Sequence, residues 1–490
     1  MQPISRRDFI ALGATAAAVT PFTGRLSRRP SAAEPGNPFA LGVTSGDPNE
    51  HSAVLWTRLV GTGLAEEVPV TWEVADDESF DTLTATGDVI AIAHEGHSVH
   101  AIAELSGASW FRFRSGDWAS SAGQVSPTPS DPSELRIAAA SCQHFESGFY
   151  AAHRDIVEWA PDLVMFLGDF IYEGGGNPEG DTVRVHEGGE IMAIEDYRAR
   201  YAQYLSDEHL RASRAAAPWL VIWDDHEVEN NYAGVAPQTI ADMATFAERK
   251  LIAYQAWWEH MPVRMARPES LDEMTIYRNV AWGDLADLIL LDGRQYRTNQ
   301  ACNDVTLSLD PPCATASEPA RTMLGAEQEE WLAKQLAIST ATWPVIGQQT
   351  VLTDARLSGA ILNYDQWDGY GPARDRLLAA AAEAERVVVL TGDIHLAAVG
   401  ILPGVGVEFV TASISSGGLV PADLEDTVAT LGDIHAAELH HRGYTRHVVT
   451  ADTWTAEYRI VDDVTDPEAA VTTWRTFVVE RAARDIVTAV

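Results

Sequence analysis

Positive charge is scarce in this chain of 490 residues: 34 Lys and Arg face 71 Asp and Glu, which gives a formal net charge of −37. Such a surface repels the phosphates of nucleic acids and anionic membrane surfaces, so neither is an expected partner. An anionic substrate must then be drawn in by cations held locally at its site. The other interpretation of the charge is a solvated acidic surface, as on exported or salt-adapted proteins.

Hydrophobic segments of membrane-spanning length are also lacking. The apolar stretch over residues 11–19 is short and rich in alanine, so we do not expect a stable membrane anchor. It follows Ser5-Arg6-Arg7-Asp8-Phe9-Ile10 and precedes the small residues Ser31-Ala32-Ala33, which is similar to a twin-arginine export signal. We therefore expect a signal peptide over residues 1–33, the twin-arginine export machinery as a partner, and a secreted, periplasmic or cell-envelope protein. A chance arginine pair before a helix is the alternative.

Cysteine is rare as well, with three residues in the whole chain. Cys302 and Cys313 lie in one short loop, and in an oxidising compartment this spacing favours a disulfide that closes the loop. Cys142 then remains alone at the end of an apolar run. A single thiol in an exported protein is either an inert core residue or a metal ligand, and Cys142 by itself does not distinguish the two.

The sequence pattern changes at a proline-rich segment, residues 126–132. Before it, short alternating strands such as residues 52–57 and 110–114 predict a small, immunoglobulin-like β-sandwich over residues 36–126. After it, apolar strands alternate with helical segments, which predicts an α/β catalytic domain over residues 134–490. We expect the proline-rich segment to be a linker at which proteolysis separates the two domains.

Within the second domain, helical periodicity and apolar runs locate individual elements. Helices are predicted at residues 194–206, 242–261, 326–337 and 374–385, and a further candidate helix closes the chain at residues 472–487. Strands are predicted at residues 285–292 and 343–350. The alternation of the two kinds of element is typical of an α/β fold.

Four apolar runs of the second domain end at residues that commonly bind metals. The runs end at Cys142, at Asp169 with Tyr172 three residues on, at Asp224-Asp225-His226-Glu227, and at Asp393 with His395 two residues on. Short β-branched runs of this kind predict strands that are buried on both faces. Such strands carry their chemistry at their carboxyl ends, where several loops converge. The four runs therefore predict one polynuclear metal site.

Gly168-Asp169-x-x-Tyr172, Asp225-His226-Glu227 and Gly392-Asp393-x-His395 resemble the motif set of dinuclear metallophosphoesterases. Ser141-Cys142-Gln143 and the Asp224 that precedes the second motif look like the PhoD-type alkaline phosphatases, which are related to the purple acid phosphatases. The resemblance covers nearly the whole mature chain, and the order of four motifs makes it specific. It implies a metallophosphoesterase-like α/β sandwich and an enzyme that hydrolyses phosphate esters.

Ligand chemistry divides the predicted site into two parts. Tyr172 as a phenolate and Cys142 as a thiolate, completed by His395, point to ferric iron (Fe3+). Free phenol loses its proton only near pH ~10, so a bound phenolate needs a strong Lewis acid. Asp169 is the candidate carboxylate that bridges this ion and the next.

The second part draws on Asp169, Asp225 and Asp393. Ligation by oxygen alone favours a hard cation, so calcium (Ca2+) is expected there, as the PhoD resemblance also implies. Asp224 or Asn231 is a candidate ligand for a further calcium ion. For Asp224 the alternative is that it merely orients its neighbour.

Two further residues are candidates for catalysis. His226, beside the ligand Asp225, is placed to contact substrate or to protonate the leaving group. Arg294, at the end of another strand, is either a clamp for a phosphate oxygen or part of a structural ion pair. We expect an exported iron- and calcium-dependent alkaline phosphatase that hydrolyses small-molecule phosphate monoesters, and also diesters, by in-line attack. The alternatives are a secreted phosphodiesterase or phospholipase-type hydrolase, and a calcium-stabilised surface-binding protein.

Overall fold

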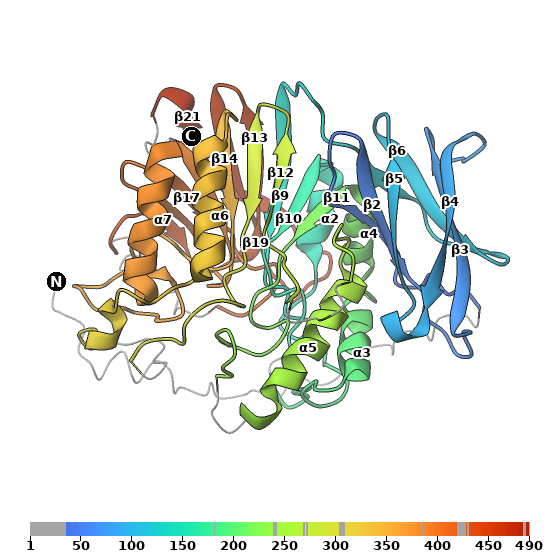
Figure 1. The fold of residues 1–490 in the computed structure, drawn as a ribbon, viewed down its shortest axis with the longest axis horizontal. Coiled ribbons are helices and arrows are strands. Elements are labelled where there is room, and N and C mark those ends of the chain that lie inside the picture. The colour runs from blue at the N-terminus through green and yellow to red at the C-terminus, as the bar shows by residue number, and fades with distance from the viewer. Residues whose placement is uncertain are drawn as a thin grey trace.

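The structure, a computed structural model, describes residues 36–490 except 181, 239–242, 268–269, 271–272, 303–308, 385, 419–427, 429–430, 484–486 and 490. The expected signal peptide at residues 1–33 lies outside the described residues. Two large β-sheets form the centre of the molecule, with helices on their outer faces and a smaller sheet at one end (Figure 1). Within the described residues, every helix falls short of the length and apolar character that a membrane span requires.

The first large sheet has ten strands in the order β22-β21-β20-β19-β9-β10-β11-β1-β2-β5. Strands β9, β10, β11 and β1 are parallel to one another, while β19 and β2 pair with this group in the antiparallel direction. In the order of the sheet, the strands span Val487–Ala489, Val471–Glu480, Thr453–Val461, Arg442–Thr450, Glu134–Ala140, Leu163–Phe166, Pro218–Val221, Val43–Gly46, Ser52–Arg58 and Ser98–Glu104.

The second large sheet has seven strands in the order β12-β13-β14-β15-β17-β16-β18. These strands span Arg278–Trp282, Ala286–Leu290, Trp343–Gly347, Val387–Thr391, Gly406–Val410, Ala397–Leu402 and Ile434–Glu438. Successive side chains of a strand point to opposite faces. In β15, Val388 and Leu390 therefore enter the core shared with the first sheet, whereas Val387 and Val389 pack with the helices on the outer face. Strands of this kind have no polar face, as the continuous apolar runs predicted.

The α-helices of the described residues divide between the two sheets. They are α2 (Ala151–Trp159), α3 (Ile194–Tyr204), α4 (Glu208–Ala216), α5 (Met243–His260), α6 (Gly325–Ile338) and α7 (Gly371–Ala384). Helices α6 and α7 cover the outer face of the second sheet (Figure 1), and α2 to α5 contribute to the core around the first. The four helices predicted inside the α/β domain are confirmed as α3, α5, α6 and α7.

The N-terminal strands form the predicted β-sandwich, but one of its two sheets is shared. The third sheet consists of β4 (Leu83–Ile92), β3 (Glu67–Ala75), β6 (Ser109–Ser115), β7 (Trp118–Ala119) and β8 (Gly123–Val125). It packs against β1, β2 and β5, with Leu55, Val74 and Phe111 in the core between them. Strand β1 pairs in parallel with β11 of the catalytic part. The sandwich precedes the catalytic domain in sequence and continues its main sheet in space.

The proline-rich segment is packed in the same region. The backbone N–H of Thr128, which is buried, donates to the carbonyl oxygen of Asn49 at 2.9 Å. Pro132 and Ser130 lie so close to the turn at Gly283 that a Cβ there would come within 2.4 Å of the proline ring. This packing and the shared sheet argue against two freely separable parts, so cleavage of the segment stays a prediction that the structure does not favour.

The helix predicted at residues 472–487 is wrong. Strand β21 occupies Val471–Glu480, followed by a 3₁₀ turn at Arg481–Ala483 and by β22. The first half of this stretch, Val471-Thr472-Thr473 through Val478-Val479, is rich in β-branched residues, which favour a pleated strand over a helix. By contrast, the predicted disulfide between Cys302 and Cys313 is confirmed.

Candidate metal centre

The four metal-binding motifs follow β9, β10, β11 and β15, and the structure brings their side chains together. Their ligand atoms fall into three groups, each with its atoms within 4.8 Å of one another: Cys142–Asp169–His395, Asp169–Asp225–His226 and Asp224–Asp225–Asp393. Asp169 belongs to the first two groups and Asp225 to the last two. The three groups therefore form one continuous array, and Asp169 occupies the position that a bridging carboxylate requires.

The backbone of the array is strained. Cys142, Asp169, Asn231, Asp393 and His395 have positive φ angles of 56°, 58°, 53°, 67° and 55°. They make up five of the twelve non-glycine residues with this conformation among the described residues. A residue with a side chain adopts it at a cost of about 1–3 kcal/mol, and such residues gather at functional sites. In Cys142, Asp169, Asp393 and His395 the conformation turns the chain just after a strand ends, which directs several ligands toward one point.

Glu227 holds two of these loops in place. Its buried carboxylate accepts the backbone N–H groups of Asp169 at 3.0 Å, Phe170 at 2.6 Å and Asp224 at 2.8 Å. Burial raises the pKa of Glu227 to about 7 even though these three hydrogen bonds lower it. The last residue of the Asp225-His226-Glu227 motif is therefore a positioning residue, which connects the ends of β10 and β11.

Tyr172 connects both sheets at the first group of ligands. Its hydroxyl donates to Asp169 Oδ2 at 2.8 Å and lies 3.1 Å from His395 Nε2 and 2.7 Å from Ser416 Oγ. Nδ1 of His395 lies 2.6 Å from the carbonyl oxygen of Gly417. Because a carbonyl only accepts, Nδ1 carries the proton and the lone pair of Nε2 points toward the tyrosine. This is the orientation that a metal-binding histidine needs.

His226 pairs with an acidic residue that the sequence analysis did not single out. Nδ1 of His226 lies 2.7 Å from Glu173 Oε2, and its ring lies against that of Tyr172 with centroids 4.1 Å apart. Burial lowers the pKa of His226, but Glu173, Asp169 and Asp225 outweigh it and raise the pKa well above its ordinary value. The pairing leaves Nε2 as the nitrogen available to the cavity that His226 lines.

Arg294 is buried behind the carboxylates of the third group. Its guanidinium binds Asp224 and lies 3.3 Å from Asp225, 2.9 Å from Asp365 and 3.8 Å from Asp393. The side chain is fully buried and is not among the residues that line the cavity. This arrangement favours the ion-pair alternative for Arg294 over the phosphate clamp. Asp365, which no motif pointed to, holds the other side of the guanidinium.

The protein alone leaves the array with uncompensated negative charge. Burial, and then the charge of Asp169, raise the pKa of the Cys142 thiol and of the Tyr172 phenol well above their usual values. Burial also raises the pKa of Asp169 and Asp224 well above theirs, and that of Asp393 to about 7, despite the positive charges of His226 and Arg294.

Two buried carboxylate oxygens of the array lack hydrogen-bond partners among the described residues. They are Asp169 Oδ1 and Asp224 Oδ2. Buried anions without partners are costly, and bound cations would remove that cost. The donor set therefore fits a metal cluster, with thiol, phenol and imidazole at one end and carboxylates at the other.

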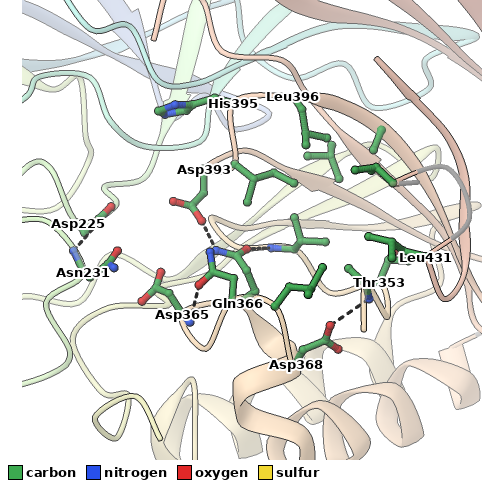
Figure 2. Close-up of a pocket in the computed structure, with 18 of the residues that line it drawn as sticks. Asp225, Asn231, Thr353, Asp365, Gln366, Asp368, Asp393, His395, Leu396 and Leu431 are labelled. Atoms are coloured by element: carbon green, nitrogen blue, oxygen red, sulfur yellow. Dashed lines mark hydrogen bonds between the residues drawn. The ribbon is translucent and has the colours of Figure 1, made fainter. Parts of the chain in front are cut away.

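A cavity of about 370 Å³ opens onto this array. Asp169, Asp225, His226, Asp393 and His395 line its polar end. Figure 2 shows Asp225, Asp393 and Asn231 on one side of this cavity. The backbone N–H of Asn231 donates to Asp225 Oδ2 at 2.6 Å, so Asn231 belongs to the carboxylate end of the array.

Comparisons with known proteins agree with this arrangement. A family model described as PhoD-like phosphatase matches residues 137–458, and a model described as PhoD-like phosphatase, N-terminal domain, matches residues 25–129. The chain belongs to the PhoD-like phosphatase family. This phosphatase is 40% identical to alkaline phosphatase D of Bacillus subtilis (strain 168) over 475 residues, which cover 91% of this chain and 81% of the relative.

Structural similarity supports the same assignment. A solved structure of PhoD matches this phosphatase with a TM-score of 0.87 at 38% identity, covering 94% of this chain and 93% of the other. The predicted resemblance and α/β fold are thus confirmed, and the enzyme is a phosphatase, a hydrolase of phosphoric esters. PhoD-like phosphatases are metal-dependent, and the three ligand groups are potential metal-binding groups of this one.

Proposed function

We propose that this phosphatase is an exported alkaline phosphatase that hydrolyses phosphate monoesters of small molecules at an iron and calcium centre. The observation that carries the proposal is the convergence of Cys142, Asp169, Tyr172, His395 and the carboxylate group, of which Asp169, His395 and two carboxylates line one end of a cavity. A calcium-stabilised protein that only bound a surface would not need a thiol and a phenol beside these carboxylates. Phosphate diesters are a second substrate class of the same site.

The donor set supports the choice of metals. Ferric iron is proposed for Cys142, Asp169, Tyr172 and His395, because thiolate and phenolate are strong donors that a ferric ion retains. Calcium is proposed for Asp169, Asp225 and Asp393, because oxygen donors in an adaptable arrangement suit this ion. Asp224 and Asn231 are the candidates for a further calcium.

Cations held by these residues would supply positive charge for the phosphate oxygens and would lower the pKa of a water molecule that attacks phosphorus. The chain itself contributes position and a proton. His226 presents Nε2 to the cavity and donates a proton to the leaving alcohol, while Glu173 holds the ring and keeps it protonated. Arg294 offsets the carboxylates of the third group and keeps them aligned.

Export is proposed from the N-terminal sequence. Arg6 and Arg7 precede the short apolar stretch, and the disulfide between Cys302 and Cys313 suits an oxidising compartment. Replacing both arginines with lysine should leave the enzyme in the cytoplasm as the uncleaved precursor, which fractionation and immunoblotting would detect. Unchanged export of that double variant would contradict the twin-arginine route.

Elemental analysis beside a visible spectrum tests the metal assignment. We expect iron and calcium, and a charge-transfer band from thiolate and phenolate that neither a calcium nor a zinc enzyme shows. A calcium chelator should abolish hydrolysis while leaving the band, and added calcium should restore the rate. A colourless zinc protein of full activity would overturn the assignment.

The alternative function is a secreted phosphodiesterase or phospholipase-type hydrolase. Apolar side chains line the cavity beyond the carboxylates, and a lipid or a second ester group could contact them, so this alternative is tested as well. Comparing kcat/KM for p-nitrophenyl phosphate and for bis(p-nitrophenyl) phosphate separates the two classes. The proposed monoesterase requires the larger value for the first compound.

A further inference from the structure

The cavity above the metal ligands has two chemically different ends. Away from the ligand array its wall is apolar, formed by Val351, Ile394, Leu396, Val410, Leu431 and Ile434. Figure 2 shows the carboxylates of Asp225 and Asp393 on one side and Leu396 and Leu431 on the other. The catalytic proposal uses only the polar end, so the apolar end has no role yet.

Residues 393–396 contribute to both ends of the cavity. Ile394 and Leu396 alternate along the chain with the candidate ligands Asp393 and His395, and all four line the cavity. The apolar wall therefore begins one residue away from the metal site. Gln366 fixes the distance between the ends, because its Nε2 donates to Asp393 Oδ2 while its Oε1 accepts the backbone N–H of Val351 at 2.7 Å.

Polar groups near the apolar end direct part of their hydrogen-bonding capacity into the protein. Asp368 Oδ2 accepts the backbone N–H of Ala355 at 3.0 Å, and Asn363 Oδ1 accepts that of Asp365 at 2.9 Å. Thr353 Oγ1 is buried and makes no hydrogen bond to any residue that the structure describes. The six apolar side chains of the wall offer no hydrogen bond to replace the water that a sugar or a charged group would lose on entering. An apolar group loses nothing there and gains burial.

We propose that this end of the cavity binds the apolar alcohol portion, alkyl or aryl, of the phosphate ester while the phosphate lies among the metal ligands. The inference rests on the proposed function as a phosphate monoesterase and names the class of ester that the enzyme prefers. A volume of about 370 Å³ is in the range of sites that enclose small molecules. Each buried methylene improves binding by about fourfold.

A series of straight-chain alkyl phosphates from methyl to hexyl tests the proposal with the metal-loaded enzyme. We expect kcat/KM to rise by about fourfold per methylene until the group fills the cavity. Ile434→Asn, at the half-buried start of β18, should flatten this slope. The matched control Ile338→Asn, at a position 60% exposed at the end of α6, should keep the slope.

A second variant and a binding measurement make the outcome independent of one substitution. Ala355→Phe narrows the apolar end without removing the backbone N–H that Asp368 accepts, so hexyl phosphate should lose its advantage over methyl phosphate. Calorimetric titration with alkylphosphonates should give Kd values with the same chain-length dependence. A flat series in the wild type, with methyl phosphate hydrolysed normally, overturns this inference and leaves the phosphatase proposal standing. Failure to hydrolyse any ester, with the metals bound, overturns both.

Discussion

The two ends of the ligand array differ in chemistry although they share a carboxylate. The first end comprises Cys142, Tyr172 and His395, and the second comprises Asp224, Asp225 and Asp393. Asp169 lies within reach of both. The difference shows how one edge of a sheet pair can hold two kinds of cation, because the ligands come from four strand ends whose residues can differ from one strand to the next.

The surroundings of the two ends differ as well. The guanidinium of Arg294 lies against all three carboxylates of the second end. At the first end the supporting contacts are neutral, the hydroxyl of Ser416 and the carbonyl of Gly417. A fixed positive charge beside a cation site weakens the binding of the ion. We therefore expect an exchangeable ion at the second end and a firmly held ion at the first.

The largest effect is expected from Asp169→Asn, which removes the one carboxylate that both ends share. Asparagine keeps the size of the side chain and tolerates the positive φ of 58°, so the backbone should be preserved. We expect both ions to be lost or replaced by other metals. The value of kcat should fall on the order of 10³-fold, since the ions stabilise the charge of the transition state by several kcal/mol. Elemental analysis and steady-state kinetics measure the change. Normal content of both metals would contradict the bridging position.

Cys142→Ala should affect the first end alone. The thiol is one of the few anionic donors there, so we expect weaker or absent colour, loss of iron and a fall in kcat of about 10²-fold or more. We remove calcium with a chelator and titrate it back to measure the affinity, which should stay within about twofold to threefold of the wild type. An active, coloured Cys142→Ala enzyme would make Cys142 a core residue.

Glu173→Gln should change proton donation and leave both ends loaded. Glutamine still contacts Nδ1 of His226 but no longer balances an imidazolium, so protonation of the leaving alcohol should suffer. Support of this kind is typically worth about 10- to 100-fold. We expect that loss in kcat for alkyl phosphates and little loss for p-nitrophenyl phosphate, whose leaving group needs no proton. Equal losses for both substrates would indicate a merely structural role.

Much of this array was predictable because each ligand follows a strand signal directly. Buried apolar runs ended at Cys142, Asp169, Asp225 and Asp393. The first three follow neighbouring parallel strands, whose carboxyl ends lie at one edge of a sheet. Asp393 follows β15 of the second sheet, so its place beside them depends on how the two sheets pack. Glu173 carried a weaker signal, since it directly follows Tyr172 but belongs to no spacing rule. Asp365, Gln366 and Ser416 had no signal at all. Their roles arise from contacts between segments far apart in sequence.

The fold shows the same division between local and long-range information. Alternating patterns located β2 and β6, yet nothing in them indicated that β1 would pair with β11, because strand pairing between distant segments leaves no local mark. The C-terminal helix was an error of a different kind. The β-branched residues of Val471–Glu480 favour a strand over the helix that was predicted there.

The smallest effect is expected at Asn231, which tests the second end without touching a carboxylate. Asn231→Gly removes the side chain but keeps the positive φ of 53° and the backbone N–H that donates to Asp225 Oδ2. Loss of one neutral oxygen donor should weaken calcium binding by about tenfold, with full activity restored at high calcium and no change in colour. Asn231→Ala removes the same donor but adds backbone strain, so it should bind calcium no better than the glycine variant. If Asn231→Gly binds calcium like the wild type while Asn231→Ala does not, the residue acts through its backbone, and its side chain is no ligand.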